Sequence, residues 1–99
     1  MSFVTVQSEL LDAAAGHLAG SASAMLTENA AAAAPTTGVV PAAADPVSVL
    51  TATQFAAYGH LYQSLSSQAE EILSLFVNTL RTSAGSYALT EAANAVVAA

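Results

Sequence analysis

The sequence predicts an all-α fold, an antiparallel hairpin of two long helices. More than half of the 99 residues are hydrophobic by type, and many of these are alanine, which favours helix but buries little apolar surface. All three prolines lie within residues 35–46, and the segments on either side contain none. Because proline breaks helices, this spacing predicts two helices and one turn in a single small domain over residues 1–99.

The first helix is predicted over about residues 8–34. Helix-forming residues fill this segment, and only Gly16 and Gly20 interrupt it. Large apolar residues recur here and just before it at a spacing of seven, at Val4, Leu11, Leu18 and Met25. This repeat predicts a narrow seam for one neighbouring helix.

The turn is predicted over residues 35–45, and the second helix is predicted to begin directly after it. Asp45 precedes Pro46. An aspartate can accept a hydrogen bond from the free amides of the first turn, and proline at the first helical position lacks the amide that would stay unpaired. Asp45 is therefore the predicted helix cap.

The second helix is predicted over about residues 46–83, where only Gly59 interrupts the helix formers. Its large apolar residues cover an arc of roughly 200°, which one antiparallel neighbour cannot cover. We therefore expect a partner to complete a four-helix bundle. The expected interface residues are Leu50, Phe55, Tyr58, Leu61, Tyr62, Leu65, Ile72, Leu73, Phe76 and Leu80. Residues 84–99 are predicted to form a mobile tail.

Charge excludes several classes of partner. The net charge is −6 and Arg81 is the only cation, so the chain cannot neutralise a run of phosphates. Nucleic acid is thus not an expected partner, and adsorption to anionic lipid is disfavoured. The N-terminus lacks the features of a secretory signal peptide, and no apolar run is long enough to span a membrane.

Catalytic and metal-binding patterns are not found, so we expect no enzyme activity and no cofactor. His17 and His60 have no second ligand-type residue at helical spacing. Glu70 and Glu71 are adjacent and point in different directions on a helix, which excludes a shared-proton pair. For Tyr58, packing with the hydroxyl group at a rim is favoured over a ligand platform, and Tyr62 is interpreted in the same way.

The sequence resembles the N-terminal domain of mycobacterial PE proteins over nearly its whole length. The resemblance is carried by "MSFV", "AAAAAPTTGVVPAAADPVS", "LTATQFAAYG" and "FVNTLRTSAGSYALTEAANA". The Pro-Glu pair that names the family is replaced by Ser8 and Glu9. Serine can act as an N-cap in place of proline at the first helical position, so Ser8 is predicted to cap the first helix.

The resemblance implies a role in secretion. PE proteins form heterodimers with all-helical PPE proteins, and the pair is exported to the cell surface or beyond by a type VII (ESX) secretion system. The export signal of the family is Tyr-x-x-x-Asp/Glu after the second helix, and Tyr87 and Glu91 match it. The short chain resembles a PE-only member. A cytosolic secretion chaperone is expected to contact the PPE subunit and not this chain.

Two functions from different classes are compatible with the sequence. The favoured one is a non-enzymatic binding module that pairs 1:1 with a PPE protein and carries the export signal. The alternative is a structural protein of a lipid surface or the cell envelope, acting as a helical homo-oligomer. Lipid adsorption usually brings several lysines or arginines to the flanks of an apolar face, and the second helix has only Arg81.

Overall fold

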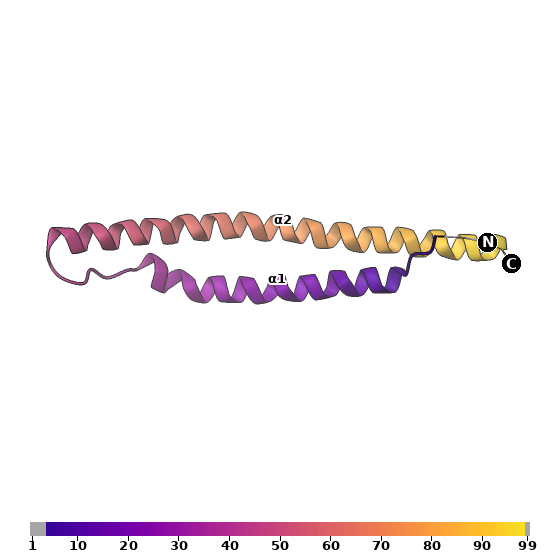
Figure 1. The fold of residues 1–99 in the computed structure, drawn as a ribbon, viewed down its shortest axis with the longest axis horizontal. Helices are drawn as coiled ribbons and strands as arrows, with labels where there is room; N and C mark the ends of the chain where they lie inside the picture. The colour runs from indigo at the N-terminus through magenta and orange to yellow at the C-terminus, as the bar shows by residue number, and fades with distance from the viewer. Residues whose placement is uncertain (1–3, 99) are drawn as a thin grey trace. The chain divides into compact units, whose positions relative to one another are not determined.

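The computed structural model describes residues 4–98, which form two α-helices and no strand. Helix α1 spans Ser8–Thr37 and helix α2 spans Pro46–Ala98, with residues 38–45 between them (Figure 1). The predicted all-α class is therefore confirmed.

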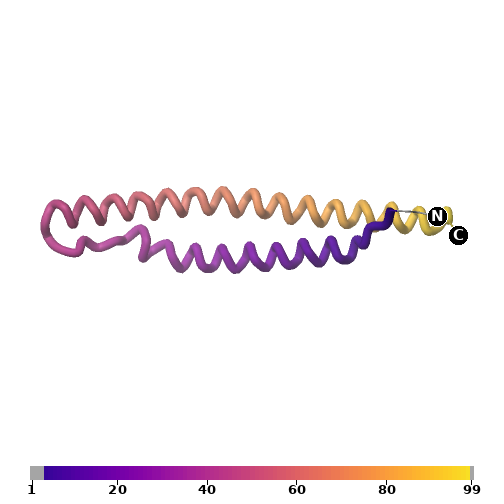
Figure 2. The backbone as a smooth tube through the Cα atoms, viewed as in Figure 1, coloured from indigo at the N-terminus to yellow at the C-terminus, as the bar shows by residue number. Residues whose placement is uncertain are grey.

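The described chain divides into two compact units, and each contains part of both helices. We call residues 23–72 the turn unit, and residues 4–22 with 73–98 the terminal unit. Within each unit a stretch of α1 lies beside an antiparallel stretch of α2, as the backbone path shows (Figure 2). The predicted two-helix hairpin is therefore confirmed.

Helix α1 ends three residues later than predicted, at Thr37 rather than near residue 34. Pro35 lies in its last turn and lacks the amide that would bond to the carbonyl oxygen four residues earlier. The Thr36 hydroxyl donates to the carbonyl oxygen of Ala32 at 2.6 Å, and the Thr37 hydroxyl donates to that of Ala33 at 2.7 Å. These bonds reach back one turn and add to the backbone ladder, which extends to the Gly38 amide, the donor to the Ala34 carbonyl oxygen at 2.9 Å. The one amide that Pro35 lacks therefore does not end the helix.

The cap of α1 lies one residue before the predicted position. The Gln7 carbonyl oxygen accepts hydrogen bonds from the amides of Leu10 and Leu11, at 3.1 and 3.3 Å. The residue whose carbonyl accepts the first helical bond is the N-cap, so Gln7 holds this position and Ser8 is the first helical residue. The prediction of Ser8 as the cap is wrong because the helix begins one residue earlier than a Ser8 cap requires.

Asp45 caps α2 as the sequence predicts. Its Oδ1 accepts a hydrogen bond from the Ser48 amide at 2.9 Å, and its Oδ2 accepts one from the Ser48 hydroxyl at 2.8 Å. The Asp45 carbonyl oxygen also accepts the Val49 amide. The two bonds from Ser48, the amide bond first, hold the pKa of the exposed Asp45 carboxyl below its ordinary value of 3.8.

The lowered pKa of Asp45 predicts an acid-sensitive contribution to stability. A group with a lowered folded pKa stabilises the fold above its unfolded pKa, and this contribution is lost as the pH falls through the folded value. In the four-helix bundle with the expected partner, Asp45→Ala should therefore unfold at a lower urea concentration than wild type near neutral pH, and the difference should shrink below pH 3.8. Asp45→Asn, which keeps a capping acceptor, should stay close to wild type. A difference that stays constant down to about pH 2 would contradict the assignment.

Helix α2 continues to Ala98, so the prediction that it ends near Ser83 is wrong. Gly85 is the only glycine after that point, and no proline follows it. One glycine costs about 1 kcal/mol in a helix relative to alanine, and the many alanines around it favour the helical conformation. The predicted tail, residues 84–98, is thus part of α2, and residue 99 lies outside the described chain.

A line of small and polar residues on α2 faces α1 in the turn unit. These residues are buried or half-buried and alternate in spacing between four and three, as in a heptad repeat. We call them the inner line: Ala52, Ala56, Gly59, Gln63, Ser66 and Glu70. In the terminal unit the same spacing is occupied mainly by larger apolar residues, at Leu73, Val77, Leu80 and Ala84.

The seam predicted on α1 is correct for two of the three described residues inside the helix. Leu11 and Leu18 are half-buried in the terminal unit, together with the fully buried Ala15. Met25 lies in the turn unit and is 54% exposed, so the seam does not continue to it. Val4 precedes the helix and is exposed.

Gly59 allows a close approach of the two helices in the turn unit. A methyl group at this position would overlap the Thr36 carbonyl oxygen and would lie 2.8 Å from its carbonyl carbon. These are backbone atoms, which cannot move aside without moving the helix. The absence of a side chain at Gly59 is therefore a packing requirement.

Gly59→Ala is expected to destabilise the hairpin by about 1–3 kcal/mol, because the added methyl group overpacks the contact. Gly20→Ala is the matched control, since a methyl group there meets nothing within 4 Å. The control should be neutral or stabilising by up to about 1 kcal/mol, because alanine favours helix. Urea titration followed by circular dichroism measures both, with each variant held in the four-helix bundle with its expected partner. Equal stabilities of the two variants would contradict the close approach.

Candidate functional site

The candidate site is a line of large apolar residues on α2, which is displaced from the inner line by roughly 100° around the helix. Its residues alternate in spacing between three and four, with the small Ala69 completing the repeat. Each of its large side chains is at least half exposed. We call this line the outer seam: Phe55, Tyr58, Tyr62, Leu65, Ile72 and Phe76. Heptad spacing of large apolar residues is typical of a surface that packs against another helix.

The structure separates the ten residues predicted for the partner interface into two groups. Leu73 and Leu80 are half-buried and continue the spacing of the inner line, so they contribute to the hairpin itself. The other eight are exposed: Leu50, Phe55, Tyr58, Leu61, Tyr62, Leu65, Ile72 and Phe76. Most of the apolar arc is therefore left uncovered by this chain.

The buried core of the described chain is thin. Its buried hydrophobic residues are three alanines, Ala15, Ala52 and Ala84, together with Val77. Covering eight half-exposed large side chains would contribute on the order of 10 kcal/mol, as much as the total stability of a small domain. The apolar side chains that α2 leaves exposed are thus larger and more numerous than those of the core that the chain forms alone.

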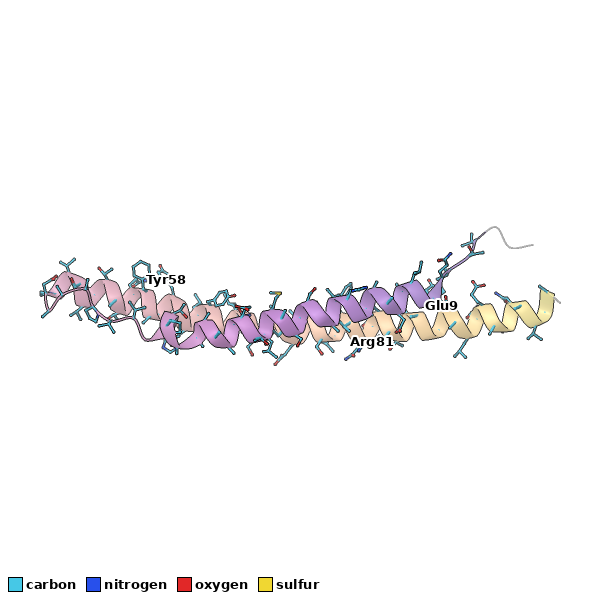
Figure 3. All side chains as sticks on the ribbon, turned by 90° about the horizontal axis from the view of Figure 1, so that it is seen from below. Glu9, Tyr58 and Arg81 are labelled. Atoms are coloured by element: carbon cyan, nitrogen blue, oxygen red, sulfur yellow. The ribbon has the colours of Figure 1, made fainter. Side chains whose placement is uncertain are left out.

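An apolar hollow lies on the turn unit beside the outer seam. It has a volume of about 390 Å³ and is lined by Ala32, Pro35, Thr36, Val39, Phe55, Tyr58, Gly59 and Tyr62. Figure 3 shows the Tyr58 side chain projecting away from the ribbon of α2. Three aromatic rings from one helix thus surround a space large enough for a bulky side chain.

A polar cluster inside the turn unit centres on Asn29. The Asn29 Nδ2 donates to Glu70 Oε1 at 3.3 Å, and the Tyr62 hydroxyl donates to Asn29 Oδ1 at 2.7 Å. The Gln63 Nε2 donates to the Asn29 carbonyl oxygen at 3.0 Å. We did not predict this cluster from the sequence, although polar residues at inner-line positions are the signal that indicates it.

Tyr87 and Glu91 both lie on α2 and are one helical turn apart. The Tyr87 side chain is 46% exposed and Glu91 is half-buried. Tyr87 borders a groove of about 340 Å³ in the terminal unit whose other lining residues carry hydroxyl groups, Thr82, Ser83, Ser86 and Thr90. Helical geometry thus places the ring and the carboxylate on one side of α2.

The single cation lies in a shallow groove of the terminal unit. Arg81 lines this groove with two acidic residues at the start of α1, Glu9 and Asp12. Glu9 and Arg81 extend from different helices (Figure 3). This arrangement places the only arginine among acidic groups.

Other candidate chemistry is not assembled in the described chain. His17 and His60 are both exposed. Over residues 4–98 no group of three or more histidines and carboxylates could hold a metal ion. Neither of the helices described here is long and apolar enough to cross a membrane.

The sequence matches known proteins along almost its whole length. The model of the PE family matches residues 4–94. The chain is 56% identical to PE family protein PE13 of Mycobacterium tuberculosis, covering 99% of each chain. It is 50% identical to PE family protein PE8 of the same organism but covers 36% of that protein. It is 48% identical to PE cleavage protein A of Mycobacterium marinum, over 17% of its length.

These relatives differ greatly in length, yet each contains a segment similar to the hairpin described above. The similarity to PE13 covers both helices and the turn, and the family match includes the whole outer seam as well as Tyr87 and Glu91. On the extent of the family match and the identity to PE13, the chain belongs to the PE family.

Proposed function

We propose that this chain is a non-enzymatic subunit that pairs 1:1 with a PPE protein and carries an export signal for a type VII (ESX) secretion system. The observation that carries the proposal is the outer seam, a heptad line of large apolar side chains that this chain leaves exposed. A PPE protein is all-helical, and two of its helices laid beside the hairpin would form a four-helix bundle.

The exposed area supports an obligate partner. The chain has an accessible surface of 7302 Å², whereas a compact monomer of 9.8 kDa would have about 5,200 Å². The difference of about 2,100 Å² is similar to the area that one subunit buries in an obligate complex. The proposed pairing would therefore bring the exposed surface to the value expected of a compact protein.

The second part of the proposal concerns Tyr87 and Glu91, which we assign to recognition by the secretion machinery. Small residues surround the pair on α2, including Ala84, Gly85 and Ala88, so a receptor can approach closely. The pair lies beyond the last residue of the outer seam, Phe76. A partner helix on the seam would leave this end of α2 accessible.

Coexpression tests the pairing. The full chain is coexpressed with each PPE protein encoded in its own genome, and the products are analysed by size-exclusion chromatography with light scattering. We expect one PPE protein to give a soluble 1:1 complex, and the chain without a PPE protein to aggregate or to lack a cooperative unfolding transition. A monodisperse monomer that unfolds cooperatively would overturn the proposal, and so would the absence of a complex with every PPE protein.

A further inference from the structure

The two helices of the turn unit face each other through side chains that are small or polar. The inner line offers alanine, glycine and serine together with Gln63 and Glu70, and α1 offers Asn29, Ala32 and Ala33. Small side chains form no large knobs, so they define only weakly which turn of α1 lies opposite which turn of α2. The close contact of Gly59 with the Thr36 backbone restricts the register at one point, and a specific interaction farther along the helices would fix it more firmly.

Asn29 has the contacts needed to fix it. Three side chains of α2 hydrogen-bond to this single residue of α1. Two of them bond to its side-chain amide and one bonds to its backbone carbonyl oxygen. The three partners, Tyr62, Gln63 and Glu70, extend over two turns of α2. A shift of α1 by one turn would move Asn29 by about 5.4 Å and would break all three bonds.

Tyr62 connects this cluster to the exposed face. Its hydroxyl group donates to Asn29 Oδ1 at 2.7 Å, while its ring is 51% exposed and lines the apolar hollow with Phe55 and Tyr58. A tyrosine held at its hydroxyl end keeps its ring in one orientation. The wall of the hollow is thereby fixed before anything enters it, which lowers the entropy cost of binding.

We propose that Asn29 is a positioning residue for the partner interface: it sets the helix register of the turn unit and holds the Tyr62 ring as a wall of the hollow, which receives one large apolar side chain of the partner helix. This inference rests on the proposed pairing with a PPE protein. Asn29 acts through Tyr62. The hollow is the part of the proposed interface in which the partner's side chain must match the shape of the wall.

A competition experiment tests the coupling. The PPE protein that forms the 1:1 complex is coexpressed in limiting amount with wild-type and variant chains carrying different tags, and the ratio of bound chains is measured. Asn29→Ala should be recovered roughly fivefold to tenfold less than wild type, and Tyr62→Phe should show a smaller loss. The double variant should bind no worse than Asn29→Ala, because both changes break the same contact.

Asn78→Ala is the matched control, an exposed asparagine of α2 outside the outer seam, and it should compete equally with wild type. If the two single losses multiply in the double variant, Asn29 does not act through Tyr62 and the proposal is overturned. Equal competition by Asn29→Ala overturns it as well. Tyr62→Phe keeps the ring and changes only the hydroxyl group, so it remains informative if Asn29→Ala folds poorly.

The register itself is measured as a distance between two positions of this chain. The chain contains no cysteine, so spin labels placed by Glu28→Cys and Gln68→Cys report a single distance within the turn unit. Asn29→Ala should broaden or shift that distance distribution, and Asn78→Ala should not. The measurement uses the complex, or the full chain alone if no PPE protein retains the wild type, in which case the proposed pairing has failed separately. An unchanged distribution overturns the role of Asn29 in register.

Discussion

Phe76→Asp is expected to abolish pairing with the PPE protein while leaving the two-helix hairpin intact. The Phe76 ring is 53% exposed in this chain, so a carboxylate there remains solvated as long as no partner covers it. Under a partner helix the same carboxylate would be buried without a cation, at a cost of about 3 kcal/mol or more. This cost corresponds to a loss of affinity of more than roughly a hundredfold.

The measurement is copurification of the tagged PPE protein with the coexpressed variant. Asn78→Asp introduces the same charge only two residues away but on the other side of α2, roughly 200° around the helix, and it should copurify like wild type. Phe76→Leu, which keeps an apolar side chain, should retain most of the binding. If Phe76→Asp copurifies as well as Asn78→Asp does, Phe76 lies outside the interface.

Tyr87→Ala and Glu91→Ala should each stop export without affecting the pairing. Tyr87 is about half exposed and Glu91 is half-buried, and no hydrogen bond from either side chain is found in the described chain. Replacing them should therefore change the stability of the complex by no more than about 0.5 kcal/mol. A receptor that binds the Tyr87 ring and the Glu91 carboxylate together would lose one of these two contacts in either variant.

Export is measured as the ratio of secreted to cell-associated protein in a strain with an active type VII system, with pull-down of the PPE protein in parallel. Leu89→Ala is a suitable control, since Leu89 lies between the pair in sequence, is 76% exposed and points to another side of α2. We expect normal export of this control. Normal export of both test variants would refute the signal, and joint loss of pairing and export would place the two residues in the bundle.

The turn and the start of α2 could be predicted because they depend on local chemistry. Proline restricts the backbone at its own position, and the Asp45 carboxylate caps an amide three residues away. The helix ends were harder to predict. Helix α1 continues past Pro35 to Thr37 although proline lacks one amide. The alanines after Gly85 favour the helical conformation, and α2 continues to Ala98. Each helix end depends on free-energy differences of about 1 kcal/mol for helix formation. The presence of a proline or a glycine does not by itself show where the helix ends.

The Asn29 cluster could not be predicted, because its partners are 33 to 41 positions away in the sequence. Periodicity identified the apolar arc of α2 correctly but not how it is shared. The arc includes Leu73 and Leu80, which belong to the hairpin, and Phe76, which does not. A division of this kind follows from which turn of α1 faces which turn of α2, and polar contacts between the helices contribute to that register.

Tyr62 is the one residue of the outer seam whose side chain also hydrogen-bonds to the other helix. If the proposed roles of Tyr62 and Asn29 hold, this double role would limit which substitutions Tyr62 can accept. Substitutions at Phe55, Tyr58 or Leu65 would change the surface proposed for the partner without breaking a hydrogen bond between the helices. A substitution at Tyr62 alters both at once. We therefore expect partner preference to evolve mainly at the other seam positions, with tyrosine retained at 62 wherever asparagine is retained at 29.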